Sequence, residues 1–344
     1  MMNYKSPPFI TVLMSVYNNE KTVGNAINSI INQSFQDFEF LIVNDGSSDN
    51  TRGVIQSFRD NRIKILDNRF NMGLTGSLNR GLEEAKGRYI ARIDADDISL
   101  SNRLEKQVLF LSKNPEFILL GTSFNITDKK HRVIKEVKFN INPEKIYYDI
   151  TFQNLFAHSS VIFRLSDAFA LGGYDRRFEF SQDYDLWYKF TRRGRTWILP
   201  DILTLWCDES GNISNKEGEE QRWIYGRIFT DNLKKLGINE ETIKYAFFLH
   251  NFNDSSFLDC PGEEIHNVFK ALLRINKKLI DNAPDFYDKS ILEDICYQNV
   301  IDLLTRIYKN TDNKSKVISF LLKNILNLKL DRKFLLKILN FVKI

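Results

Sequence analysis

About the first hundred residues alternate between two hydrophobic periodicities. Short, nearly continuous apolar runs at 9–16, 38–43, 63–66 and 89–93 are separated by stretches whose apolar residues recur at helical spacing. Continuous apolar runs of this length suit strands that are buried on both faces of a parallel sheet. Because strands that alternate with helices form right-handed crossover units, we predict an α/β fold with a mostly parallel sheet and flanking helices.

Polar residues follow each of these predicted strands. In open sheets of this kind, ligands bind outside the carboxyl ends of the strands. We therefore expect polar groups that are far apart along the chain to lie together at one edge of the sheet. The strand ends are Tyr17-Asn18, Asn44-Asp45, Asp67-Asn68 and Asp94-Ala95-Asp96.

The pattern changes from about residue 99, and beyond residue 216 it becomes mainly helical. The elements predicted in between are helices over 104–111 and 183–193 and short strands over 117–121, 133–139, 161–164, 197–200 and 203–206.

The composition limits the cellular compartment and the kinds of partner that we expect for this protein. The three cysteines are odd in number and form no C-x-x-C pair, which argues against a disulfide framework or a zinc site. A net charge of +4 is too small to suggest nucleic acid as a partner. We find neither a secretory signal nor a run of about 18 apolar residues. We therefore expect a cytoplasmic protein, soluble or peripheral on the inner face of the cytoplasmic membrane.

Residues 314–344 combine basic charge with many apolar side chains. The segment holds eight basic residues and one acidic residue, and its net charge of +7 exceeds the +4 of the whole chain. Basic amphipathic helices lie on anionic membrane surfaces, which makes peripheral contact with an anionic membrane one interpretation. The alternative is a helix that packs on the domain and exposes its lysines to solvent.

Three carboxylates follow the fourth predicted strand in Asp94-Ala95-Asp96-Asp97. Charges held this close repel one another, and a hard divalent cation bound together with substrate phosphates would offset the repulsion. The alternative is a helix N-terminus capped by Asp96, Asp97 and Ser99. The position at the end of a sheet strand, with Asp45 at the end of a second one, favours the cation site.

Asp45 lies in the segment VNDGSSD, in which Asp-Gly-Ser is also a turn signal. A carboxylate here could instead accept a hydrogen bond from a ring N–H of a nucleotide base. Uracil offers this N–H and cytosine does not, so such a site would select uridine. Both interpretations are open from the residues alone.

Together, the motifs resemble those of the inverting glycosyltransferases of family 2, which have the GT-A nucleotide-sugar fold. The resemblance covers about residues 8–215 and is closest to bacterial enzymes that extend lipopolysaccharide, lipooligosaccharide or capsule chains. Several ordered motifs at matching intervals are far more specific than any one of them. They are SVYN at 15–18, VNDGSSD at 43–49, N-x-G at 71–73 and 79–81, ARIDADD at 91–97, N-x-x-x-HSS at 154–160, GGYD at 172–175 and QDYDLW at 182–187.

The resemblance implies a GT-A type, Rossmann-like fold followed by a helical C-terminal region. The catalytic domain would span residues 1–215, with a nucleotide-binding half at about 1–98 and an acceptor half at 99–215. Residues 216–344 would form the helical region, with a basic amphipathic end.

The resemblance also implies a donor site for a UDP-sugar. Asp45 would help to hold the uridine, and Asp94 would contact the ribose or the ring region. Asp96 would ligate Mn²⁺ or Mg²⁺ through the diphosphate, with Asp97 in support. The donor-binding residues would be Ser15, Tyr17, Asp45, Asn71, Arg92 and Asp94.

The resemblance assigns the catalytic base to Asp183. The acceptor hydroxyl would lose its proton to this carboxylate as it attacks the anomeric carbon, while the metal stabilises the departing diphosphate. One base without a covalent partner gives a single in-line displacement and therefore inversion. The alternative for Asp183 is an N-cap of the predicted helix.

Three further residues are candidates for the acceptor cleft. His158 follows Asn154 and precedes two serines, and it either lines the cleft or is a packed side chain. Tyr174 and Trp187 could stack on a sugar ring, with core packing as the alternative for Trp187.

Two positions depart from the family pattern. Gln182 stands before Asp183 where the family often has Glu. The family often has Tyr-Arg-x-His after the last strand of the domain, and here the stretch is Trp206-Cys207-Asp208-Glu209. Asp208 or Glu209 could replace the histidine as an oxygen ligand, or a water or a basic residue could complete the site.

The expected function is sugar transfer from a UDP-sugar to a hydroxyl of a glycan or glycolipid acceptor. A non-catalytic nucleotide-sugar-binding partner in a glycan assembly complex is the alternative, because of the departure at 206–209. A nucleotidyltransferase would need a Gly-rich loop with Lys or Arg after the first strand, and residues 17–20 are not such a loop. Without a Q-x-x-R-W motif or membrane spans, a processive polysaccharide synthase is not expected.

Overall fold

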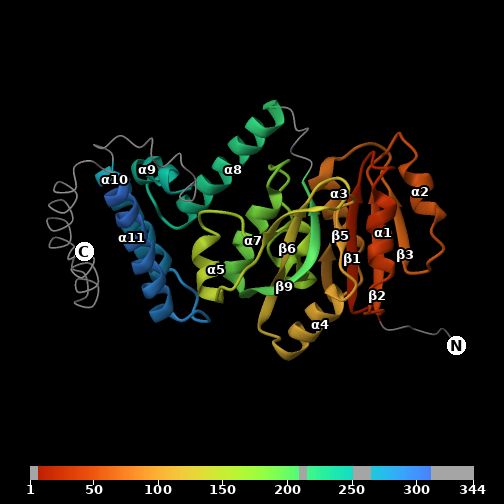
Figure 1. Cartoon of the computed structure of the whole chain (residues 1–344), viewed down its shortest axis with the longest axis horizontal. Coiled ribbons are helices and arrows are strands. Elements are labelled where there is room, and N and C mark those ends of the chain that lie inside the picture. Colours follow the sequence, from red (N-terminus) through yellow and green to blue (C-terminus); the bar gives the residue numbers. More distant parts are fainter. Residues whose placement is uncertain (1–6, 209–214, 251–264, 311–344) are drawn as a thin grey trace. The chain divides into compact units, whose positions relative to one another are not determined.

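The computed structural model describes residues 7–208, 215–250 and 265–310 (Figure 1). The chain divides into two compact units, the first ending at Asn232 and the second beginning at Leu233. The boundary predicted at 215–216 falls at the start of helix α8 (Asn215–Lys235), most of which belongs to the first unit.

One sheet organises the described part of the first unit. Its order is β3-β2-β1-β4-β8-β6-β9-β5, and β7 pairs with β6. The four N-terminal strands are parallel, whereas β8 is antiparallel to both of its neighbours. The strands are β1 (Ile10–Val16), β2 (Phe38–Asn44), β3 (Ile63–Asp67), β4 (Tyr89–Arg92), β5 (Ile98–Ser99), β6 (Phe117–Thr127), β7 (Val133–Val137), β8 (Ile162–Arg164) and β9 (Arg195–Cys207).

Helices cover both faces of this sheet, because successive residues of a buried strand point to opposite faces. Leu13 of β1 joins one apolar cluster, which includes residues of α3, α5, α7 and α8, while Val12 and Met14 join a second cluster with α1, α2 and α4. The helices of this unit besides α8 are α1 (Val23–Ile31), α2 (Thr51–Ser57), α3 (Gly73–Glu84), α4 (Arg103–Lys113), α5 (Pro143–Asp149), α6 (Leu165–Ala170) and α7 (Gln182–Arg193).

The predicted α/β fold class is confirmed, but several elements differ from the prediction: β6 continues beyond the predicted 117–121, and β5, α5 and α6 were not predicted. The two short strands predicted at 197–200 and 203–206 are a single strand, β9, which pairs in parallel with β6. The pairing shifts register where Leu199 faces Thr122 and Ile202 faces Ser123. Pro200 lies in this irregularity, where its missing N–H costs no ladder hydrogen bond. The proline therefore interrupts the pattern in the sequence without ending the strand.

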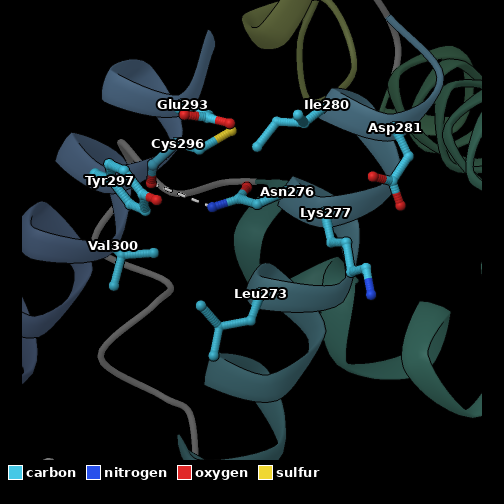
Figure 2. Close-up of a pocket in the computed structure, with 9 residues that line it drawn as sticks. All are labelled: Leu273, Asn276, Lys277, Ile280, Asp281, Glu293, Cys296, Tyr297 and Val300. Carbon is cyan, nitrogen blue, oxygen red and sulfur yellow. Dashed lines mark hydrogen bonds between the residues drawn. The ribbon is translucent and has the colours of Figure 1, made fainter. Parts of the chain in front are cut away.

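The described part of the second unit is helical, as predicted, with α9 (Glu240–His250), α10 (Ile265–Asp281) and α11 (Lys289–Asn310). A cavity of about 260 Å³ lies between α10 and α11 (Figure 2). At its wall, the Asn276 side-chain amide donates a hydrogen bond of 3.2 Å to the Cys296 carbonyl. Within the described ranges, no helix has the length and apolar character needed to span a membrane. The basic segment 314–344 lies outside the described residues.

Candidate active site

The loops that follow β1 and β2 are joined to each other by hydrogen bonds. The Asn18 amide donates to Ser47 Oγ at 3.0 Å, and the Ser48 amide donates to Asn18 Oδ1 at 2.8 Å. The Asn19 amide donates to Thr51 Oγ1 at 2.7 Å. The predicted gathering of strand ends at one edge of the sheet is thus confirmed. Of the donor-site candidates in β1 and its loop, Ser15 is buried and Tyr17 is 48% exposed.

Asp45 is buried at the end of β2, where it holds the loop that follows β3. Its Oδ1 accepts hydrogen bonds from Asn68 Nδ2 at 2.6 Å and from the Met72 amide at 2.8 Å. The next residue, Gly46, has a φ of +69°, and a Cβ there would lie 2.8 Å from the Phe70 carbonyl carbon. Only glycine fits this close approach with a left-handed backbone. Asn71 is exposed in the same loop and accepts a hydrogen bond from the Gly73 amide.

Arg92 is fully buried and joins the two halves predicted from the sequence. Its guanidinium donates to the Leu13 carbonyl at 2.6 Å and the Ile93 carbonyl at 2.8 Å, and its Nε donates to His158 Nε2 at 3.0 Å. The same guanidinium pairs with the Asp94 carboxylate. A buried cation with this many partners is a rigid support for Asp94 rather than a group that is free to meet a ligand.

Asp94 is held from both sides. Its amide donates to Ser159 Oγ at 2.9 Å, and the Ser159 hydroxyl donates back to Asp94 Oδ2 at 3.0 Å. Burial alone would raise the pKa of Asp94, but Arg92, His158 and Ser159 together outweigh it and lower the pKa. Asp94 is therefore an anion with a fixed orientation.

His158 lies between Arg92 and Tyr174, with its Nε2 at 3.0 Å from the Tyr174 hydroxyl oxygen. Burial and the neighbouring Arg92 charge lower the pKa of His158 to about 3. The imidazole is consequently neutral at physiological pH. Tyr174 is 1% exposed and Trp187 is fully buried, with its ring against those of His158 and Tyr174. This burial favours core packing, the alternative interpretation of Trp187, and leaves neither ring an open face for a sugar.

Asp96 and Asp97 follow at the edge of the sheet. Asp96 is partly buried, and Asp97 is 1% exposed. Asp97 Oδ1 accepts a hydrogen bond of 2.7 Å from the Cys207 amide, at the end of β9. This contact brings the segment 206–208, where the sequence departs from the family, next to the acidic motif. Asp208 is itself anchored through its amide, which donates to the Thr127 carbonyl at 2.9 Å, and Glu209 lies outside the described residues.

The donor set of this motif fits a hard cation. Asp97 Oδ2 is buried and accepts no hydrogen bond, and burial together with the charges of Asp96 and Asp94 raises the pKa of Asp97 well above its ordinary value. A buried carboxylate oxygen beside further carboxylates is the environment that Mg²⁺ or Mn²⁺ satisfies. Within the described residues, however, no three His, Cys, Asp or Glu side chains are already arranged around one metal position.

Asp183 lies in the first turn of α7. Its Oδ2 accepts a hydrogen bond of 2.9 Å from Asn154 Nδ2, and its Oδ1 accepts one of 2.8 Å from the Tyr184 amide. Burial raises the pKa of Asp183 to about 6, the negative charge of Asp94 adds to the rise, and the two hydrogen bonds oppose it. The charge of Asp94 thus reaches Asp183, the predicted base, electrostatically.

Two motif residues of the predicted pattern have packing roles instead. The Asn79 side chain bonds both ways to the Tyr174 backbone, accepting from its amide at 2.9 Å and donating to its carbonyl at 2.8 Å. Gly173 has a φ of +68°, and a Cβ there would lie 2.6 Å from Asn79 Oδ1. These residues fix the loop that leads to Asp183, and this loop borders a cavity of about 340 Å³.

Sequence reasoning missed three supporting residues. Ser159 and Asn154 belong to a motif that the sequence displays, yet their bonds to Asp94 and Asp183 follow only from the fold. Tyr225, in α8, lies outside all the motifs, and no pattern in the sequence identifies it as a residue of the site. Its hydroxyl oxygen accepts a hydrogen bond of 2.7 Å from the Asn154 amide.

The mostly parallel α/β sheet with an acidic motif at its edge agrees with the GT-A fold that the resemblance to family 2 implies. The family model for glycosyl transferase family 2 matches residues 11–170. The O-antigen biosynthesis glycosyltransferase WbnJ of Escherichia coli is 34% identical over 276 residues, which cover 79% of this chain and 100% of WbnJ. The chain belongs to glycosyltransferase family 2.

Two further similarities extend this assignment. The E. coli UDP-Glc:alpha-D-GlcNAc-diphosphoundecaprenol beta-1,3-glucosyltransferase WfgD is 34% identical over 178 residues, covering 52% of this chain and 68% of WfgD. The structure of S. aureus TarS 1–349 in complex with UDP-GlcNAc is similar with a TM-score of 0.58 at 18% identity, over 90% of each chain. The TarS similarity concerns the fold alone and agrees with the predicted GT-A fold.

Proposed function

We propose that this protein transfers a sugar from a UDP-sugar to a hydroxyl of a glycan acceptor, with inversion and by a single displacement. The acceptor is a lipid-linked or surface polysaccharide precursor. The relatives support this class of substrate, because WbnJ is named for O-antigen biosynthesis and WfgD for transfer from UDP-Glc to a diphosphoundecaprenol-linked GlcNAc. The solved TarS complexes contain UDP and UDP-GlcNAc.

The observation that carries the proposal is the environment of Asp183. A carboxylate with a pKa near 6 is ionised at neutral pH and is still a better proton acceptor than an ordinary aspartate. Asn154 and the Tyr184 amide fix its orientation. As the acceptor hydroxyl attacks the anomeric carbon, Asp183 takes its proton, and the bond to the departing diphosphate breaks on the opposite side.

The donor binds at the edge formed by the first strands. Ser15, Tyr17 and Asp45 hold the uridine, and Asp94 orients the ribose from the position that Arg92 and Ser159 give it. Asn71 forms part of the pocket wall. Exposed Tyr17 offers a flat ring to the base, whereas buried Asp45 offers a carboxylate to its imide N–H.

Asp96, with Asp97 in support, holds Mn²⁺ or Mg²⁺. When bound, this ion offsets the negative charge that develops on the diphosphate. Among the acceptor candidates, His158 acts from its buried position by fixing Arg92 and Tyr174.

The test is a donor screen followed by two substitutions. Purified protein is incubated with Mn²⁺, a simple acceptor and UDP-Glc, UDP-Gal, UDP-GlcNAc or UDP-GalNAc, and released UDP is measured. We expect Asp96→Asn and Asp183→Asn each to abolish transfer. Asp37→Asn is the matched control, because Asp37 is exposed just before β2, at the opposite end of that strand from Asp45. Unchanged transfer in both active-site variants would refute the assigned roles, and UDP binding without turnover would support a non-catalytic binder.

A further inference from the structure

We propose that Tyr225, on helix α8, is a positioning residue for the catalytic base Asp183 and acts through Asn154. The inference rests on the proposed function, because it assumes that Asp183 is the base. It extends the catalytic machinery into a helix that lies beyond the residues matched by the family model.

The connection consists of two hydrogen bonds in series. The Tyr225 hydroxyl oxygen accepts from the Asn154 backbone amide at 2.7 Å, and the Asn154 side chain donates to Asp183 Oδ2 at 2.9 Å. The Asn154 side-chain oxygen is itself fixed, since it accepts from the Phe156 amide at 3.1 Å. The amide is thereby oriented with its nitrogen toward Asp183, and the backbone that carries it is tied to α8.

Tyr225 is held firmly enough for this task. Its ring stacks on that of Tyr184, the residue after the base, with centroids 4.5 Å apart and an interplanar angle of 16°. On either side of it along α8, Ile224 and Ile228 are buried in the apolar cluster that α7 also joins. A second ring contact, between Phe152 and Phe229, ties the same loop to the same helix. The hydroxyl is thus placed by packing and not by its hydrogen bond alone.

The electrostatic surroundings give this arrangement a measurable consequence. The negative charge of Asp94, after β4, raises the pKa of Asp183, and the charge of Asp183 in turn raises the pKa of Tyr174, in the loop before α7, and of Tyr225, on α8. The hydrogen bond from Asn154 stabilises the ionised form of Asp183 and lowers its pKa. Loosening Asn154 should therefore raise the pKa of the base further.

The principal variant is Tyr225→Phe, which keeps the stacked ring and removes only the hydroxyl. We expect kcat to fall by about 3- to 10-fold, the equivalent of one ordinary hydrogen bond, with the KM for the UDP-sugar unchanged. The acidic limb of the pH–kcat profile should move up by about half a unit to one unit. Asn154→Ala should have the same effects. The double variant should be no worse than Asn154→Ala, because both changes break the same connection.

Tyr188→Phe is the matched control. The Tyr188 hydroxyl also bonds a backbone atom, donating to the Asn232 carbonyl at 3.3 Å, and Tyr188, on α7, belongs to the apolar cluster against which Tyr225 packs. Its hydrogen bond leads to Asn232 and not to Asn154, so kcat and the acidic limb should stay at their wild-type values. A general loss of packing would affect Tyr188→Phe and Tyr225→Phe alike.

A second readout does not depend on turnover. In protein labelled with ¹³C at aspartate carboxyl carbons, the Asp183 signal is the one that Asp183→Asn removes, and its titration midpoint should rise in Tyr225→Phe. An unchanged midpoint and pH profile in Tyr225→Phe would overturn the inference, as would additive losses in the double variant. If Asp183→Asn itself retained activity, the proposed function would fail instead, so the two failures are distinguishable.

Discussion

Replacing Asp183 with asparagine should stabilise the first compact unit at neutral pH while it abolishes transfer. Burial raises the pKa of Asp183 from 3.8 to about 6. The folded state therefore binds this proton more tightly than the unfolded state does. Between pH 4 and pH 6 the Asp183 carboxyl ionises readily in the unfolded state but only at a free-energy cost in the folded state. The free energy of unfolding therefore falls as the pH rises through this range.

The size of this cost follows from the shift. Each pKa unit corresponds to about 1.4 kcal/mol, so a shift of roughly two units costs about 3 kcal/mol once Asp183 is fully ionised. Asp183 is partly accessible, so solvent screening reduces the expected value to about 1–2 kcal/mol. Asparagine has the same shape and does not titrate, and its single side-chain oxygen can accept from Asn154 Nδ2 or from the Tyr184 amide, as the carbonyl oxygen of protonated Asp183 can. The variant should thus gain about 1–2 kcal/mol over the wild type above pH 7 and little or nothing below pH 4.

Urea unfolding followed by tryptophan fluorescence measures this difference. All four tryptophans, Trp187, Trp197, Trp206 and Trp223, lie in the first unit, so the signal reports its unfolding. Free energies of unfolding are compared for wild type, Asp183→Asn and the exposed control Asp37→Asn from pH 4 to pH 8. A difference between wild type and Asp183→Asn that is flat across this range, or that grows toward acid pH, would refute the buried-carboxylate argument.

Three further outcomes are expected. Arg92→Met should destabilise the first unit by about 2–3 kcal/mol in the same urea assay, since it removes a fully buried cation with its hydrogen bonds and leaves the partly exposed Asp94 unpaired; a loss below 1 kcal/mol would contradict that support role. Gly173→Ala should cost about 1–3 kcal/mol, because the added Cβ meets Asn79 Oδ1 in a left-handed backbone, and equal thermal midpoints would speak against it. Truncation after Asn313 should release the protein from anionic vesicles in a sedimentation assay and spare UDP binding; equal sedimentation of both forms would argue against a membrane role.

The N-terminal strands and the edge that they form could be predicted because their signals are local. A continuous apolar run identifies β1 or β2 without reference to the rest of the chain. The topology rule then places Asn18, Asp45 and Asn68 at the same edge, and the hydrogen bonds among these loops agree with it. β1, β2 and β4 are buried throughout, as their apolar runs predict, whereas β3 lies at the edge of the sheet and is only partly buried.

The supports of the site could not be predicted, because they depend on pairs of residues that only packing brings together. Tyr225 and Asn154 are 71 positions apart, and neither residue type identifies the other. At Pro200 the opposite happened, because a local signal predicted too much. Proline predicts the end of a strand, but β9 continues past Pro200 through the register shift with β6. Likewise, an exposed tryptophan and a buried one look the same in the sequence, and the location of Trp187 in the apolar cluster decides its role.

The buried network also bears on the role proposed for Asp183 as a base among several other carboxylates. Arg92 offsets the charge of Asp94 at close range, so that Asp94 raises the pKa of Asp183 without preventing its ionisation at neutral pH. His158, which would ordinarily titrate in the same range, stays neutral because it is buried against Arg92. A loss of activity between pH 7 and pH 5 would therefore report the protonation of a carboxylate and not of an imidazole. Asp94 and Asp183 are in this way linked electrostatically, although they lie on opposite sides of the predicted boundary at residue 98.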